Sequence, residues 1–341
     1  MFSKIALLAA RKPGKIVGPI ASFLGIFYNG LFNIIFSMTQ NGTGSLAAAI
    51  IIFTIIVKMI LLPLTYKQQK STYKMQKIQP LVKKIQDKYR DRDDRESQQR
   101  MAFEIQELQR EHGVGMMSGC LPLLIQLPIL YGLFYLFQQA YVYVDVIGAN
   151  YSSIANALLA VPVDVRVSAL TQTVVSHGLT IDVAVYDDLI TLVNAISKTD
   201  VANILSQLGN YASTLEPLFA QKIATEYFCG INLVARAGLS FPGIIIPILS
   251  GLSTWVSSKM LSDSNKVQMQ AAGTEAAASG ESTMKIMNIV MPIMMGVFAI
   301  NMPAGLGLYW IITNVIQLVQ TLLLRKHFEK KEKAEAEKGA A

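Results

Sequence analysis

The sequence predicts an all-α protein that crosses a membrane several times, and three observations support this. The 341 residues are 52% hydrophobic and only 16% charged, with a mean hydropathy of +0.39, which is too apolar for an ordinary soluble domain. Five segments are long and apolar enough to cross a bilayer as helices, which takes about 20 residues each. The net charge of +7 is concentrated in a few segments, as is typical of loops sorted across a membrane.

The five predicted spans are joined by connections of very different length. The last two are separated only by Asn301, Met302 and Pro303, so we expect them to be antiparallel neighbours joined by a tight turn. The predicted spans are 46–66, 114–140, 241–261, 284–301 and 304–324.

A further apolar segment, 16–38, lies in the N-terminal region 1–45 and has two interpretations. Small and polar residues, from Gly18 and Ser22 to Ser37, recur on one helical stripe. This stripe is typical of an amphipathic helix in the membrane interface, and equally of a sixth span that packs this face on its neighbours. Basic residues precede the segment and favour a sixth span or a signal-like segment, because basic residues tend to stay in the cytoplasm. They are Lys4, Arg11, Lys12 and Lys15.

The distribution of lysine and arginine predicts the orientation of the spans. Segment 67–112 carries twelve of these residues, whereas the much longer segment 141–240 carries four. The C-terminal tail, 326–341, is also rich in lysine. Because basic loops remain in the cytoplasm, we expect 67–112 and the tail inside and 141–240 outside.

Segment 67–112 is predicted to form a helical hairpin. Two apolar seams at helical spacing flank a charged break at 91–94, which is typical of a pair of antiparallel helices. The hairpin could be a docking arm or only a solvated connector. The seam residues are Met75, Ile78, Val82, Ile85 and Tyr89 on the first helix and Met101, Ile105 and Leu108 on the second.

Neither the long outside segment nor the rest of the chain carries a recognisable catalytic arrangement. Segment 141–240 contains helix-like stretches but no nucleophile–base arrangement, glycine-rich phosphate loop or carboxylate pair at a telling spacing. The three histidines lie in separate segments. We therefore expect no enzyme activity, no cofactor, no metal site and no ATP site.

Lys58 is the main functional signal, because it lies in the middle of the first predicted span. A charge at that depth costs roughly 2.5–3.5 kcal/mol on insertion scales and normally faces water or a partner. Other spans also carry polar residues on one face, which can simply bond across helices while Lys58 reaches toward the interface. No acidic residue lies in any of the five spans, so we favour a shared wet groove open to the cytoplasm. The predicted groove residues are Lys58, Thr54, Gln126, Ser257, Trp310, Asn314 and Gln317.

Three motifs, in this order along the chain, resemble those of the YidC/Oxa/Alb family of membrane protein insertases. The first surrounds Lys58, the second contains Gln126, and the third opens the last span. The motifs read Val57-Lys-Met-Ile-Leu-Leu-Pro-Leu-Thr65, Gly119-Cys-Leu-Pro-Leu-Leu-Ile-Gln-Leu-Pro128 and Met302-Pro-Ala-Gly-Leu-Gly-Leu-Tyr-Trp310.

The resemblance implies five core helices around a hydrophilic groove, an interfacial helix at 16–38 and a cytoplasmic hairpin. The chain is similar to the shorter, Gram-positive-like members, which lack a large periplasmic domain. Lys58 occupies the position of the family's groove arginine, and Thr54 and Trp310 match polar and aromatic groove positions. Two features depart from the pattern: lysine lacks arginine's planar five-donor fork, and segment 141–240 is longer than expected.

The resemblance further implies an insertase and chaperone of the bacterial plasma membrane, with its C-terminus in the cytoplasm. Lys58 would draw the acidic tail of a nascent membrane protein into the groove, and the apolar segment would leave into lipid. Expected partners are nascent membrane proteins, membrane lipid, the ribosome through the tail and hairpin, and the Sec translocon. Alternatives are a small-anion transporter or channel that uses Lys58, and an assembly factor without a groove.

Overall fold

The computed structural model describes residues 17–39, 42–90, 92, 94–114, 121–271 and 289–339. Within them the regular structure is almost entirely helical, and the strands form one two-residue antiparallel pair. The predicted all-α class is therefore confirmed. The basic residues Lys4–Lys15, residues 115–120 of the second predicted span and residues 284–288 of the fourth lie outside the described residues.

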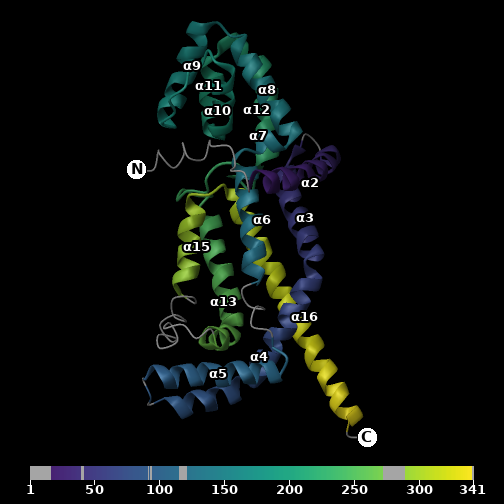
Figure 1. The fold of residues 1–341 in the computed structure, drawn as a ribbon. Helices are drawn as coiled ribbons and strands as arrows, with labels where there is room; N and C mark the ends of the chain where they lie inside the picture. The colour runs from purple at the N-terminus through teal and green to yellow at the C-terminus, as the bar shows by residue number, and fades with distance from the viewer. Residues whose placement is uncertain are drawn as a thin grey trace. The chain divides into compact units, whose positions relative to one another are not determined.

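The described helices and strands follow one another as shown in Figure 1. Those before residue 140 are α2 Val17–Met38, α3 Ser45–Ile60, α4 Leu62–Tyr89, α5 Arg95–Glu111 and α6 Leu121–Gln138. Next come α7 Ala140–Tyr143, α8 Asp145–Leu159, α9 Val163–Ser176, α10 Tyr186–Ala195, α11 Lys198–Gln207, η3 Gly209–Tyr211, α12 Ala212–Glu226, β1 Tyr227–Phe228 and β2 Ile231–Asn232. The last are α13 Ile245–Ala271, α15 Met291–Ile300 and α16 Ala304–Gly339.

Among the described residues, two helices are by themselves long and apolar enough to cross a membrane. They are Gly18–Met38 in α2 and Ala304–Glu335 in α16. Helices α3 and α4 pass the same test only as a pair, and they are bent by 63° at the break between them. Pro63 explains the bend, because it has no N–H to donate to the carbonyl of Met59. The predicted span 46–66 is thus interrupted at Leu61.

The chain divides into two compact units, and helices α3, α6, α13, α15 and α16 contribute residues to both. Unit 1 comprises Met1–Phe53, Pro128–Pro247 and Phe298–Tyr309. Unit 2 comprises Thr54–Leu127, Ile248–Val297 and Trp310–Ala341.

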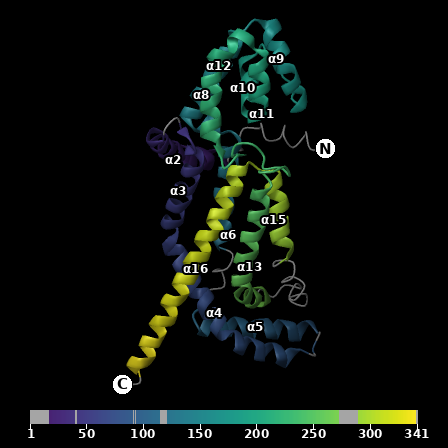
Figure 2. The same cartoon turned by 180° about the vertical axis from the view of Figure 1, so that it is seen from behind.

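Unit 1 contains a helical bundle built from α8 to α12, which Figures 1 and 2 show as one group. Its apolar interior also holds an ion pair between Lys222 and Glu226, whose side chains are 2% and 1% exposed. The hydroxyl of Tyr151 donates to Oε1 of Glu226 at 2.7 Å. Arg166 is buried as well, and its Nη1 donates to the carbonyls of Leu158 and Leu159 at the end of α8. The predicted outside segment is therefore an ordered bundle.

Helix α2 packs through one face on the neighbouring parts of unit 1. Tyr28 is fully buried between the rings of Phe53 on α3 and Phe137 on α6. Asn29 exchanges two hydrogen bonds with Asp145, at 2.7 and 3.0 Å. Both views show α2 lying across the start of α3, the part of that helix that belongs to unit 1 (Figures 1 and 2).

The start of α16 is hydrogen-bonded to the extended segment 233–238 of unit 1. The amides of Ala304 and Gly305 donate to the carbonyls of Ala235 and Leu233, at 2.8 and 2.7 Å. A Cβ added at Gly305 would lie 3.0 Å from the carbonyl oxygen of Leu233. The close approach of these two backbones explains why glycine stands in the third motif.

In unit 2, α4 and α5 pack as an antiparallel hairpin through the two seams. Met75, Ile78 and Val82 on α4 are buried against Ile105 on α5, with Ile85, Met101 and Leu108 packed against them. Glu104 links the helices by accepting from Lys88 Nζ and the Tyr89 hydroxyl, both at 2.7 Å.

The end of α16 is attached to α4 within the same unit. Phe328 packs edge-on against Tyr66, with ring centroids 5.2 Å apart. Glu332 accepts from the Tyr73 hydroxyl at 2.8 Å and pairs with Lys77. These contacts hold the C-terminal part of α16 beside α4.

Candidate functional site

Lys58 lies in the last turn of α3 in unit 2 and is only 8% exposed. Its Nζ donates to Oε1 of Gln317 on α16 at 3.3 Å, which is long for such a bond. Among the described residues, the other two N–H groups have no partner, and none of the ion pairs involves Lys58. The negative end of the α3 dipole favours a cation here, by up to about 2 kcal/mol in partly buried sites. The ammonium is thus held by dipoles and a neutral amide.

Polar residues continue from this contact along α16. The Thr321 hydroxyl donates to the carbonyl of Gln317 at 2.8 Å and accepts from Gln69 Nε2 at 2.9 Å. Gln69 itself is on α4, beyond the bend, and is buried. Two neighbouring hydrogen bonds therefore join α16 to other helices. One comes from the charged Lys58 on α3, and the other from the neutral Gln69 on α4.

Trp310 and Asn314 form a different group with α13. The Trp310 indole donates to the hydroxyl of Thr254 at 2.9 Å, and Asn314 Nδ2 donates to the same hydroxyl at 3.2 Å and to Ser253 at 3.0 Å. Thr254 donates its own proton to the carbonyl of Ser250 at 2.7 Å. Its one donor and two acceptor positions are all used. We call these four residues, Ser253, Thr254, Trp310 and Asn314, the α13–α16 clasp.

The structure places the other predicted groove residues in the same unit without joining them all. Thr54 is fully buried on α3, one turn before Lys58 and on the same face. Gln126 is half-buried on α6. Ser257 is half-buried on α13, but its side chain forms no hydrogen bond with the described residues, whereas Ser253 and Thr254 do. Of the seven predicted residues, Lys58 and Gln317 are joined by a direct hydrogen bond.

Sequence reasoning did not select Gln69, Ser253 or Arg325. Gln69 is eleven residues after Lys58, which is about three helical turns, but the search for polar residues ended with the apolar segment. Ser253 precedes Thr254 directly and was not on the chosen face. Arg325 directly precedes the basic tail 326–341 and follows the last predicted span, 304–324, so it was assigned no role in the groove. Extending the polar stripe of α16 by one turn beyond Thr321 would have found it.

Several buried polar atoms of unit 2 have no partner among the described residues. They include the hydroxyls of Ser250 on α13 and Thr313 on α16, and Oε1 of Gln320. Buried polar groups in proteins are almost always paired with protein, water or a ligand. Together with Lys58, they give unit 2 several buried polar groups whose hydrogen-bonding capacity is not filled by the described residues.

Comparison with known proteins agrees with the architecture. The model of the 60Kd inner membrane protein family matches residues 38–332. The membrane protein insertase YidC of Clostridium perfringens is 29% identical over 313 residues, which is 91% of each chain. The membrane protein insertase YidC 1 of Listeria monocytogenes is 27% identical over 86% of this chain and 68% of its own. The membrane protein insertase MisCA of Bacillus subtilis is 26% identical, over 81% and 69% respectively.

Proposed function

Because this chain belongs to the 60Kd inner membrane protein family, we propose that it inserts nascent proteins into the bacterial plasma membrane. The names of its relatives support the activity. The observation that carries the mechanism is Lys58, a buried cation whose bonded partner is the neutral Gln317 and which joins no ion pair among the described residues. A site of this kind is suited to an anion that arrives from elsewhere.

The arriving anion is a carboxylate in the short extracellular tail of a substrate. Moving an isolated carboxylate into an apolar medium is prohibitive, so its passage needs a partner. Two unit charges 4 Å apart attract by about 4 kcal/mol at an effective dielectric constant of 20. Lys58 supplies this attraction, with Gln317 and Thr54 as polar neighbours and Gln126 from α6. The carboxylate replaces the long bond to Gln317 with a charged one.

The apolar segment of the substrate then leaves sideways into lipid. Burial of its apolar surface contributes roughly 25 cal/mol per Å² and supplies the driving force. The α13–α16 clasp keeps two helices together while this happens, because its hydrogen bonds are already complete. Trp310 and Asn314 act here as structural residues, and Lys58 as the residue that contacts the substrate.

We place the hairpin α4–α5 and the C-terminal end of α16 in the cytoplasm and the α8–α12 bundle outside. The distribution of lysine and arginine supports this orientation. The exposed lysines of α16 and the charged hairpin would contact the ribosome, and the Sec translocon would deliver some substrates. Helix α2 lies in the outer interface, because it crosses α3 and is bonded to Asp145 at the start of the bundle.

Purified protein in liposomes tests the proposal with a single-span substrate that has a short acidic tail. We expect insertion by the wild type, retention of activity by Lys58→Arg, and a loss of about tenfold or more by Lys58→Ala, since a charged hydrogen bond contributes about 1.5–3 kcal/mol. The matched control is a substrate with a neutral tail, which should be insensitive to Lys58→Ala.

The same liposomes separate insertion from small-anion transport. If the protein moves a small anion across the membrane and inserts no substrate, it is a transporter that uses Lys58. Equal insertion by Lys58→Ala and the wild type across several acidic-tailed substrates would show that the charge is not needed.

A further inference from the structure

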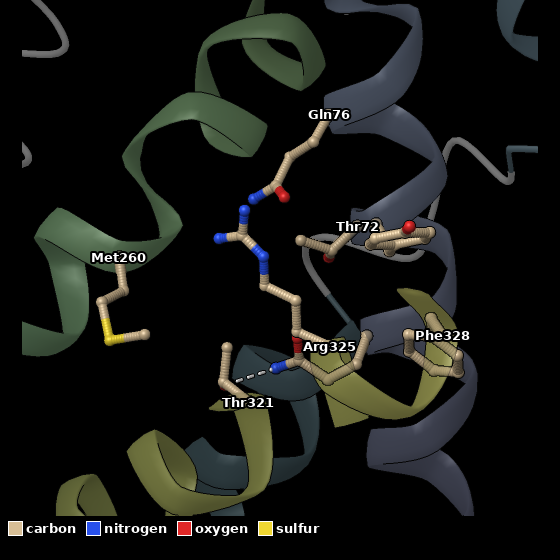
Figure 3. Close-up of a pocket in the computed structure, with 8 residues that line it drawn as sticks. Thr72, Gln76, Met260, Thr321, Arg325 and Phe328 are labelled. Carbon is tan, nitrogen blue, oxygen red and sulfur yellow. Dashed lines mark hydrogen bonds between the residues drawn. The ribbon is translucent and has the colours of Figure 1, made fainter. Parts of the chain in front are cut away.

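A second cation, Arg325, lines a small pocket at the end of the polar residues of α16. The pocket lies between α4, α13 and α16, and all of its lining residues belong to unit 2. Among these described lining residues, Arg325 is the only charged one (Figure 3). The lining residues are Gln69, Thr72, Tyr73, Gln76, Met260, Thr321, Arg325 and Phe328.

The guanidinium of Arg325 is available to a ligand. Its Nε donates to Glu329 one turn later at 3.1 Å, but this pair is 57% and 47% exposed, and exposed pairs of this kind are weak. Figure 3 shows the guanidinium extending across the pocket toward Gln76 on α4. A guanidinium has five donors in a planar fork, which matches the two oxygens of a carboxylate. Arg325 can therefore bind a carboxylate without breaking a buried interaction.

Polar contacts connect this pocket to Lys58. Thr321 lines the pocket and donates to the carbonyl of Gln317, whose side chain bonds to Lys58. Arg325 follows Gln317 by eight residues, which is about 12 Å along the helix. An anion held at Lys58 is too far from Arg325 for a direct hydrogen bond, and salt weakens the attraction between exposed charges beyond a Debye length of about 8–10 Å. A carboxylate therefore contacts the two cations one after the other.

We propose that Arg325, with Gln69, Thr72 and Gln76, is an entry site that binds a carboxylate of the substrate's acidic tail before that tail reaches Lys58. This inference rests on the proposed insertase function. It assigns the pocket to the substrate rather than to a lipid headgroup, because the polar residues run from it to Lys58. Arginine is suited to the entry position, because its charge is permanent and its contact with a carboxylate is bidentate.

The test uses full-length protein in liposomes and measures the rate of insertion of one substrate with either an acidic or a neutral tail. We expect Arg325→Gln to slow the acidic-tailed substrate about tenfold and to leave the neutral-tailed one unchanged. Arg325→Lys should fall between Arg325→Gln and the wild type. The matched control is Lys259→Gln, which removes the same charge from α13 at a residue that packs over Trp255 and does not line the pocket.

Cross-linking provides a second measurement that does not depend on the rate. A cysteine at Thr72 should form a disulfide with a cysteine in the tail of an arrested substrate, and Arg325→Gln should reduce its yield. Equal slowing by Lys259→Gln, or equal slowing of both tails by Arg325→Gln, would overturn the entry site. A defect that vanishes when anionic lipids are replaced by zwitterionic ones would assign the pocket to a lipid headgroup instead.

The proposed function and the entry site can fail separately. Absence of insertion by the wild type would refute the function. Insertion that requires Lys58 but is unaffected by Arg325→Gln, with no cross-link at Thr72, would refute only the entry site.

Discussion

The Thr254 hydroxyl has all of its hydrogen-bonding positions occupied, whereas the Lys58 ammonium does not. The hydroxyl donates to Ser250 and accepts from Trp310 and Asn314, so no position is left for a substrate. Lys58 has one long bond to a neutral partner. The same stretch of unit 2 thus contains both a completed helix contact and an incomplete one, and only the incomplete one is suited to binding.

Removing the Thr254 hydroxyl should weaken the clasp. We expect Thr254→Val to lose about 1 kcal/mol of stability, since intramembrane hydrogen bonds average about 0.6 kcal/mol each. Thermal unfolding in detergent measures the loss, and the fluorescence of Trp310 in a Trp255→Phe background should shift as its indole loses its acceptor. Thr254→Ser is the control and should retain both properties. An unchanged spectrum in Thr254→Val would contradict the clasp.

The buried ion pair between Lys222 and Glu226 in the α8–α12 bundle gives a second prediction about individual residues. Burial, and then the neighbouring Glu226, raise the pKa of Tyr151 well above its ordinary value, so its hydroxyl remains a donor at neutral pH. We expect Tyr151→Phe to cost about 1.5–3 kcal/mol, because a charged hydrogen bond is lost. Glu226→Gln should cost more, about 3–5 kcal/mol, because Lys222 stays buried without its partner.

The rates of hydrogen exchange of the α8 and α12 amides measure the loss of stability in each of these variants. The triple variant Lys222→Met, Glu226→Leu and Tyr151→Phe removes both charges together with the hydroxyl that donates to Glu226, and should be close to neutral. If it is as destabilising as Glu226→Gln, the cost does not come from an uncompensated charge.

At the scale of elements, the hairpin α4–α5 combines an apolar seam with a polar link at its far end. Lys88, and then Tyr89, lower the pKa of Glu104 below its ordinary value through their hydrogen bonds. A carboxyl whose pKa is lowered on folding stabilises the folded state above its ordinary pKa. That contribution is lost as the pH falls through the lowered value.

Acid should therefore loosen the far end of the hairpin before it affects the seam. We expect faster exchange of amides near Tyr89 and Glu104 as the pH falls below about 4, after correction for the intrinsic rate. Glu104→Gln should show the same loosening at neutral pH and no further change in acid. An acid response that is the same in Glu104→Gln and the wild type would exclude Glu104 as its cause.

The sequence was sufficient for the helical class and for the seams of the hairpin, because both depend on periodic burial. It was not sufficient for the bend at Leu61, because hydropathy summed over 46–66 does not register the missing N–H of Pro63. The stripe on α16 showed which face is polar, but not which neighbour each residue meets. Trp310 and Asn314 bond to α13, whereas Gln317 and Thr321 bond to α3 and α4. That division depends on tertiary packing.

At the scale of the whole molecule, the orientation in the membrane decides what each part can meet. Cys229 is exposed in the turn between β1 and β2. In a Cys120→Ser background it should react in intact cells with a maleimide that cannot cross the membrane. A cysteine at the exposed Lys338, in a background without both native cysteines, should react only after lysis. The reverse pattern would invert the proposed topology and place Arg325 on the wrong side for entry.

Helix α2 gives the last prediction, because its length permits a span while its contacts favour the interface. Its ring contacts fall on Phe53 and Phe137, and Asn29 near its middle is bonded to Asp145, which the proposed topology places outside. Ser22 and Ser37 are exposed near opposite ends, about 22 Å apart along the helix. Cysteines at both positions should react from outside in intact cells if α2 lies in the interface. Reaction at Ser37 alone would show that α2 spans, and the N-terminal lysines and arginines would then be cytoplasmic.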